Sequence, residues 1–130
     1  MKKHWKKETE GLETAEAQLK KVLMNNAMMM RDKKRIFETL IKDVDLFDEF
    51  YVQLLKEMRK QWYDFYVDLI EECKKEGCLD KEISDEILIS VLIGGFSNYI
   101  RTWLEFQNGS KEEFYADMEK CADFLIKRFK

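Results

Sequence analysis

The stretch from Ile87 to Phe106, ILISVLIGGFSNYIRTWLEF, is apolar on nearly every side when it is wound as a helix, and small residues such as Gly94 and Gly95 interrupt it. A surface helix of a globular protein has one apolar stripe and one charged face, whereas a helix that is apolar all round must be covered on all sides. A chain of 130 residues covers one side easily. The pattern therefore predicts that a second copy of the protein covers the other side.

Apolar residues recur at steps of three and four in the other segments of the chain, which predicts helices over residues 13–30, 32–41, 46–76 and 110–129. Gly77 is typical of the residue after a helix end, and Ser84 and Ser110 are typical N-caps of the helices that follow them. The chain contains no Pro and no sequence repeat is evident. These signals predict an all-α fold, an antiparallel bundle of about five to six helices that forms one domain over residues 1–130.

Spacing separates two faces of the 87–106 helix. One line, Leu92, Phe96, Tyr99 and Trp103, is expected to face the interior of the domain. The other line is rich in small residues and would form a flat apolar patch together with a stripe of the final helix, a patch too large to leave in water. Pairing two such patches about a two-fold axis makes a four-helix interface, so we predict a homodimer. The expected interface residues are Ser90, Gly94, Ser97, Arg101, Phe114, Met118, Cys121 and Leu125.

Charge is unevenly distributed along the chain. The first 35 residues carry ten Lys or Arg and five Asp or Glu, and the remainder carries thirteen and twenty-one, so the net charge is -3. An acidic body argues against direct contact with a nucleic-acid backbone, which requires a basic face. The basic start is short and mixed with glutamates, and we interpret it as a solvated helix end rather than a nucleic-acid arm.

The three cysteines are an odd number, and the charged start MKKHWKKETEG is not followed by the apolar segment of a signal peptide. Reduced cysteines in the cytoplasm are therefore expected. The longest uninterrupted apolar run is far shorter than the roughly 18 residues of a membrane span, so no membrane association is expected. Cys73 and Cys78 flank a helix end without a nearby His, which favours buried inert thiols over a metal site.

The chain offers little for catalysis. His4 is its only histidine, so neither a Ser-His or Cys-His nucleophile nor a three-His zinc site can be assembled from this chain alone. Gly94 and Gly95 lie inside a helix, where their N–H groups cannot cradle a phosphate. We therefore expect no enzyme activity, no metal and no cofactor.

Aromatic side chains are more numerous than a small helical core usually needs, at 13% of the residues. Tyr and Trp carry polar atoms that need partners when buried, so a group of them either lines a pocket or fills the core. The methionines of the 13–30 helix fit either an adaptable cavity or an ordinary core gap, and the core gap is the favoured interpretation. If a pocket exists, the expected ligand-binding residues are Met24, Met28, Phe37, Phe50, Trp62, Phe65, Tyr66, Phe96, Tyr99 and Trp103.

From about Phe47 onward, the order of segments resembles the C-terminal regulatory domain of TetR-family transcriptional repressors. The resemblance rests on the helix end ECKKEGCL, on the Gly-Gly-Phe and Tyr-x-x-x-Trp-Leu of the following helix, and on the final amphipathic helix SKEEFYADMEKCADFLIKRF. The helix-turn-helix that reads DNA in this family is missing, because no segment before Leu12 could form two helices. The sequence is then either a fragment of a longer repressor or a shortened homologue.

The resemblance implies a function. A small hydrophobic or amphipathic effector would bind among the helices of residues 13–77 and the 87–106 helix, and the last two helices would form the dimer interface. Ligand would favour one dimer geometry and so change the separation of two DNA-reading heads. The alternative is a helical adaptor without DNA binding, which acts by pairing with another protein through the same patch.

Overall fold

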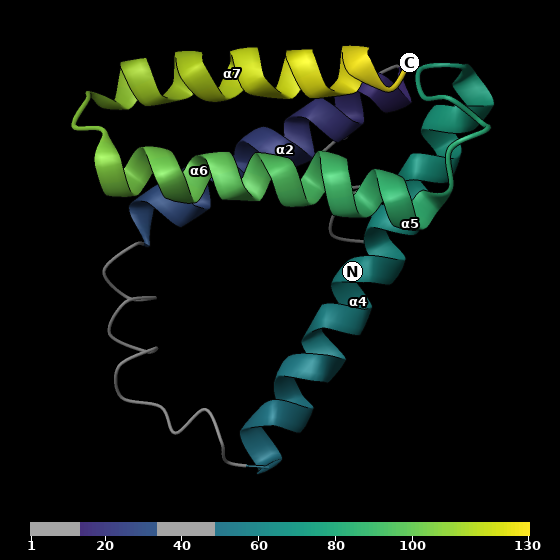
Figure 1. Ribbon diagram of the computed structural model, residues 1–130, viewed down its shortest axis with the longest axis horizontal. Helices are drawn as coiled ribbons and strands as arrows, with labels where there is room; N and C mark the ends of the chain where they lie inside the picture. The colour runs from purple at the N-terminus through teal and green to yellow at the C-terminus, as the bar shows by residue number, and fades with distance from the viewer. Residues whose placement is uncertain (1–13, 34–48) are drawn as a thin grey trace.

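The structure is a computed structural model that describes residues 14–33 and 49–130, and within these ranges all regular structure is helical and no strand occurs (Figure 1). The prediction of an all-α fold is confirmed, while the helix expected over residues 32–41 falls mostly outside the described residues. The elements are α2 (Ala15–Asp32), α4 (Glu49–Glu76), α5 (Asp85–Leu88), the π-helix η1 (Ile89–Ile93), α6 (Gly94–Phe106) and α7 (Lys111–Arg128).

Helices α6 and α7 lie side by side and run antiparallel, and α2 lies behind both of them (Figure 1). Helix α4 crosses this group obliquely and contacts it through α2, α5 and η1. The core gathers between these layers. Its largest fully buried side chains are Phe96, Phe114, Leu19, Leu23, Leu69, Ile70, Leu79, Leu88, Leu92, Ile100 and Met118.

Helix α2 begins one to two residues after the predicted start, and its first N–H groups have partners. The Thr14 hydroxyl accepts a hydrogen bond from the Ala17 N–H at 3.1 Å, as an N-cap does. The Ala15 N–H donates to the Glu76 carboxylate at 2.5 Å. This second bond ties the start of α2 to the end of α4, although 61 residues separate the two in the chain.

Helix α4 is 28 residues long, about 42 Å at 1.5 Å per residue. Its C-terminal half packs on the core, through Phe65, Tyr66, Leu69, Ile70 and Cys73. Residues 56–61 are all exposed. The prediction of a long helix ending at Gly77 is confirmed.

Gly77 ends α4 in the left-handed conformation, with φ of +81°. The Cys78 N–H donates to the Cys73 carbonyl at 3.0 Å and the Gly77 N–H to the Lys74 carbonyl at 3.1 Å, the two bonds of a Schellman motif. The buried pair Cys73 and Cys78 supplies the apolar contact that accompanies this motif. Both thiols are therefore part of a helix end.

Replacing Gly77 with alanine is expected to lower the free energy of unfolding by about 1–2 kcal/mol, because a Cβ is disfavoured in the left-handed region. Space is not the cause, since nothing lies within 4 Å of a Cβ built at this position. Urea denaturation would measure the loss. Gly77→Asn is the matched control and should lose less, because asparagine tolerates this conformation. Equal losses in the two variants would contradict the explanation.

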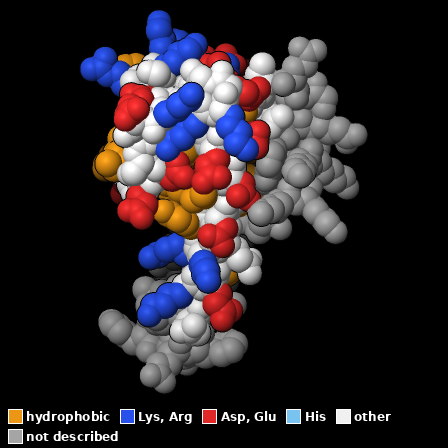
Figure 2. Space-filling model, turned by 90° about the vertical axis from the view of Figure 1, so that its right-hand side faces the viewer, with side chains coloured by type: hydrophobic (Ala, Val, Ile, Leu, Met, Phe, Trp, Pro, Cys, Tyr) orange, Lys and Arg blue, Asp and Glu red, His pale blue; other side chains and the backbone are white. Residues whose placement is uncertain are grey.

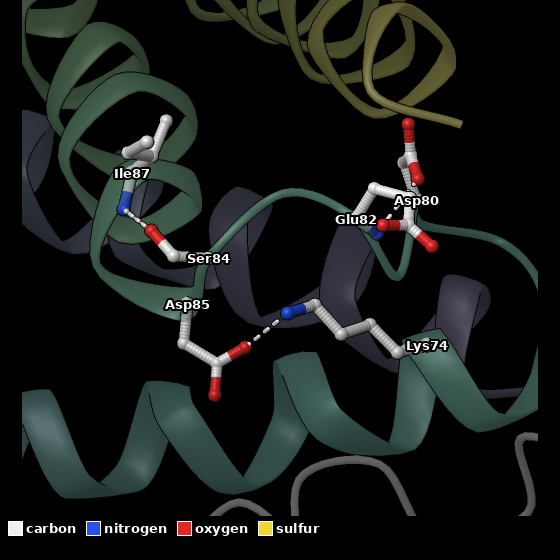
Figure 3. A network of polar contacts seen from close by, with 6 residues as sticks. All are labelled: Lys74, Asp80, Glu82, Ser84, Asp85 and Ile87. Carbon is white, nitrogen blue, oxygen red and sulfur yellow. Dashed lines mark hydrogen bonds and ion pairs between the residues drawn. The ribbon is translucent and has the colours of Figure 1, made fainter.

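The connection from α4 to α5 is held by a short polar network (Figure 3). The Lys74 ammonium pairs with the Asp85 carboxylate at 2.5 Å, and both side chains are largely buried. The Ser84 hydroxyl accepts from the Ile87 N–H at 3.2 Å, which confirms the predicted N-cap. These bonds attach the start of the α5–η1–α6 helix firmly to α4.

Residues 85–106 form one continuous helix, but its middle is a π-turn that the sequence pattern did not reveal. A π-turn inserts one extra residue and rotates the side chains that follow it. The helix ends at Phe106, slightly before the predicted Asn108 and Gly109. Ser110 caps α7 through a hydrogen bond from the Glu113 N–H at 3.1 Å, as predicted.

The same helix, Asp85–Phe106, is 22 residues long, and its most apolar 18-residue window has a mean hydropathy of 1.3. By length and composition alone it could cross a membrane. A count of uninterrupted apolar runs underestimates this helix, because Ser90, Gly94, Gly95 and Ser97 interrupt its apolar residues. Within the structure 28% of that window is buried, so much of its apolar surface has no cover inside the protomer.

Candidate functional site

The outer side of the α5–η1–α6 helix is an exposed apolar surface. Ile87, Val91 and Phe106 are 53%, 46% and 76% exposed. Gly94 and Gly95 lie between them, and nothing is within 4 Å of a Cβ built on either one. The buried residues of this helix, which include Leu92, Phe96 and Trp103, point the opposite way into the core. The helix therefore has one covered side and one open side.

Helix α7 adds an exposed phenylalanine to this surface. The Trp103 indole N–H donates to the Asp117 carboxylate at 2.9 Å, so the side of α7 that carries Asp117 is turned toward α6. Phe124 follows Asp117 by seven residues, which returns it to nearly the same side of the helix, and it is 64% exposed. We call the combined surface, Ile87, Ser90, Val91, Gly94, Gly95, Asn98, Arg101, Phe106 and Phe124, the α6–α7 face.

Hydrophobic side chains gather at the left edge of Figure 2, the side of the molecule that faces the viewer in Figure 1, where α6 and α7 lie. The upper part of the face in the centre of Figure 2 instead carries acidic and basic side chains intermixed, and a second, separate group of hydrophobic side chains lies below it. A mixed-charge surface suits water, whereas a contiguous apolar patch marks a site of interaction. The α6–α7 face is therefore the candidate site of association.

The structure revises the predicted interface residues. Ser90, Gly94 and Arg101 are exposed on the α6–α7 face and Ser97 is half-buried at its edge. Phe114 and Met118, which were predicted at the interface, are fully buried in the core of the protomer and do not reach its surface. Helix α2 packs on both α6 and α7 and covers the apolar stripe of α7 inside the protomer. Cys121 and Leu125 are half-buried against the same core.

Sequence reasoning missed Ile87, Val91 and Phe124. The step of four between Ile87 and Val91 was the available signal, since it places both on one side of the helix, and both are exposed. Phe124 lies outside the main apolar stripe of its helix, and a large apolar residue out of phase with a stripe was the available signal.

Part of the predicted ligand site forms a compact aromatic cluster on α4. The ring centroids of Phe65 and Tyr66 are 5.1 Å apart, and Trp62 stacks on Tyr66 at 5.8 Å. The Tyr66 hydroxyl accepts a hydrogen bond from the Asn26 amide of α2 at 3.0 Å. Met24 is buried in the same core, and Met28 and Trp62 are partly buried against it.

The remaining predicted ligand residues lie elsewhere. Trp103 packs edge-to-face on Phe114, with centroids 4.9 Å apart, and bonds to α7. Tyr99 lies near Asp117; partial burial, and secondarily that carboxylate, raise the pKa of its hydroxyl. These two rings therefore serve the α6–α7 contact, and Phe96 is a core residue at 1% exposure. Phe37 lies outside the described residues, as does the side chain of Phe50.

A surface depression of about 280 Å³ lies between α2 and the start of α7. Met28, Lys111, Glu112 and Tyr115 line it. Of the predicted ligand residues only Met28 borders it, so this depression is distinct from the aromatic cluster.

Reactive groups are few in the described part of the chain. Burial raises the pKa of the Cys73, Cys78 and Cys121 thiols, which disfavours the nucleophilic thiolate at neutral pH. All three are free thiols. Among residues 14–33 and 49–130 no group of three His, Cys, Asp or Glu side chains is arranged to hold a metal ion.

Comparisons of the chain with known protein families, with curated proteins and with solved structures gave no match. The resemblance to TetR-family regulatory domains therefore rests on the residues quoted above.

Proposed function

We propose that this chain is an effector-sensing and dimerisation domain of a TetR-like regulator. The observation that carries the proposal is the uncovered apolar α6–α7 face on a layer of two antiparallel helices. Ile87, Val91 and Phe124 are each about half exposed or more on the protomer. Two such layers, packed about a two-fold axis, bury these side chains in a four-helix interface.

The effector, a small hydrophobic or amphipathic molecule, would bind beside the aromatic cluster Trp62, Phe65 and Tyr66. Trp62 is partly buried and offers an apolar ring at the edge of the core. The Tyr66 hydroxyl and the Asn26 amide supply polar atoms next to it. An apolar body with a few polar tips is the usual composition of a small-molecule site.

Helix α4 connects that site to the helix that carries the α6–α7 face. The aromatic cluster and Lys74 are on the same helix, and Lys74 pairs with Asp85 at the start of the helix that carries the α6–α7 face. Two dimer geometries would differ in the position of α4. An effector with a higher affinity for one of these positions would shift the equilibrium toward that geometry, by an amount set by the difference in affinity. DNA-reading heads, if present in the complete protein, would register the shift.

One observation favours the alternative, an adaptor that uses the α6–α7 face without sensing a ligand. Phe65 and Tyr66 are only 5% and 3% exposed, and their rings already contact each other. An adaptor requires no further space at this position. Ligand binding therefore discriminates between the two functions.

Replacing Trp62 with alanine is expected to weaken binding of the dye anilinonaphthalene sulfonate to the folded chain by roughly tenfold or more, because burying a large ring contributes about 1.5–3 kcal/mol. Fluorescence titration and the ligand-dependent shift in melting temperature measure it. Tyr63→Ala, on the same helix at a 37% exposed position, is the control and should bind normally. Equal binding by wild type and Trp62→Ala would contradict the site, and loss only in Tyr115→Ala would move it to the depression.

A further inference from the structure

The charged residues that border the α6–α7 face have opposite signs at its two ends. Glu86 and Arg101 are both exposed, and the chain between them, residues 87–100, contains no charged residue. The exposed positions of this interval are Ile87, Ser90, Val91, Gly94, Gly95 and Asn98. Neither Glu86 nor Arg101 forms an ion pair within the part of the chain that the structure describes.

Gly94 lies midway between the two charges. Glu86 precedes it by eight residues and Arg101 follows it by seven, so each charge is about 10–12 Å from Gly94 along the helix axis. Gly94 and the adjacent Gly95 are also the positions where a second helix can approach most closely, because neither has a side chain and both have open space in front of them.

We infer that the α6 helices of two copies cross antiparallel about a two-fold axis at Gly94, so that Glu86 of each copy faces Arg101 of the other. The inference rests on the proposed dimerisation and specifies its register. An antiparallel crossing places opposite charges together twice, once on each side of the axis. A parallel pairing would place Glu86 beside Glu86 and Arg101 beside Arg101, and like charges facing each other disfavour association.

The occupant of the face is therefore a second copy of this chain. Its centre is uncharged, as the core of an interface usually is, and its charges lie at the rim. Rim charges contribute orientation and selectivity more than affinity, so the pairs act chiefly by excluding the parallel alternative.

Charge reversal tests the register. Arg101→Glu and Glu86→Arg, each alone, are expected to raise the dimer dissociation constant about tenfold or more in sedimentation equilibrium, since each creates two like-charge contacts. The double variant should return to within about threefold of wild type. Lys21→Glu, an exposed position on α2, changes net charge as Arg101→Glu does and should have little effect. A wild type that stays monomeric would overturn the proposed dimerisation and the register together.

The register alone would be overturned if wild type dimerises but the double variant does not regain wild-type affinity. The same holds if Lys21→Glu weakens the dimer as much as Arg101→Glu does. Disulfide trapping provides a second measurement if a charge-reversed chain fails to fold. In a Cys121→Ser background, a mixture of Glu86→Cys and Arg101→Cys chains should cross-link under mild oxidation, while neither chain alone should. Cross-linking of Glu86→Cys with itself would show the parallel arrangement and overturn the inference.

Discussion

Replacing Gly94 with leucine should convert the dimer into a monomer without destabilising the protomer. The position is helical, with φ of -62°, and nothing lies within 4 Å of a Cβ built there. Leucine is a better helix former than glycine by up to about 1 kcal/mol, so the isolated protomer should gain stability slightly. The dimer is expected to lose stability, because two leucines would meet where the two helices are closest.

Overpacking of a close contact costs about 1–3 kcal/mol, so the dissociation constant should rise by roughly fivefold to more than a hundredfold. Light scattering across a concentration series measures this change. Ala116→Leu is the matched control, because it adds a similar side chain at an exposed position of α7. An unchanged dimer in Gly94→Leu would remove Gly94 from the interface.

Replacing Phe114 with alanine should lower the free energy of unfolding by about 3–5 kcal/mol, the usual cost of deleting a buried aromatic ring. Phe114 is 0% exposed and packs edge-to-face on Trp103, with ring centroids 4.9 Å apart. For a domain of this size such a loss is a large part of the total stability. Urea denaturation, at one fixed protein concentration because dimerisation adds to stability, measures the change.

Phe124→Ala is the matched control for this prediction, since it makes the same chemical change ten residues later in the same helix. Phe124 is 64% exposed, so the variant should lose little protomer stability and should instead weaken the dimer. Equal loss of protomer stability in the two variants would contradict the placement of α7 in the core. A full-strength dimer in Phe124→Ala would exclude Phe124 from the α6–α7 face.

Local signals in the sequence predicted the helices and their ends well. Ser84 and Ser110 cap the helices that begin after them, and Gly77 ends α4 with a positive φ. These features depend on hydrogen bonds and sterics within a few residues, so the residues involved are neighbours in the chain. The all-α class follows from the same local information.

The candidate site was predicted less well, because it depends on how the helices rotate against one another. The spacing of apolar residues placed Phe114 and Met118 on an apolar stripe, but it could not show that α2 covers that stripe. Trp103 and Tyr99 were expected in a pocket, and they lie against α7 instead. In both cases the spacing identified the apolar side of a helix, but it did not identify the helix that covers this side.

By itself, the sequence determined that the protein is helical and where most of the described helices begin and end. It also indicated that the 87–106 helix has more apolar surface than one protomer covers. The tertiary structure decided which apolar residues remain outside. The inward position of Leu92 and Phe96 was predicted, but only the packing of α2 behind α6 and α7 shows that Phe114 and Met118 are covered within the protomer while Ile87 and Val91 stay exposed. A period in the sequence specifies a stripe, but only long-range packing specifies what covers it.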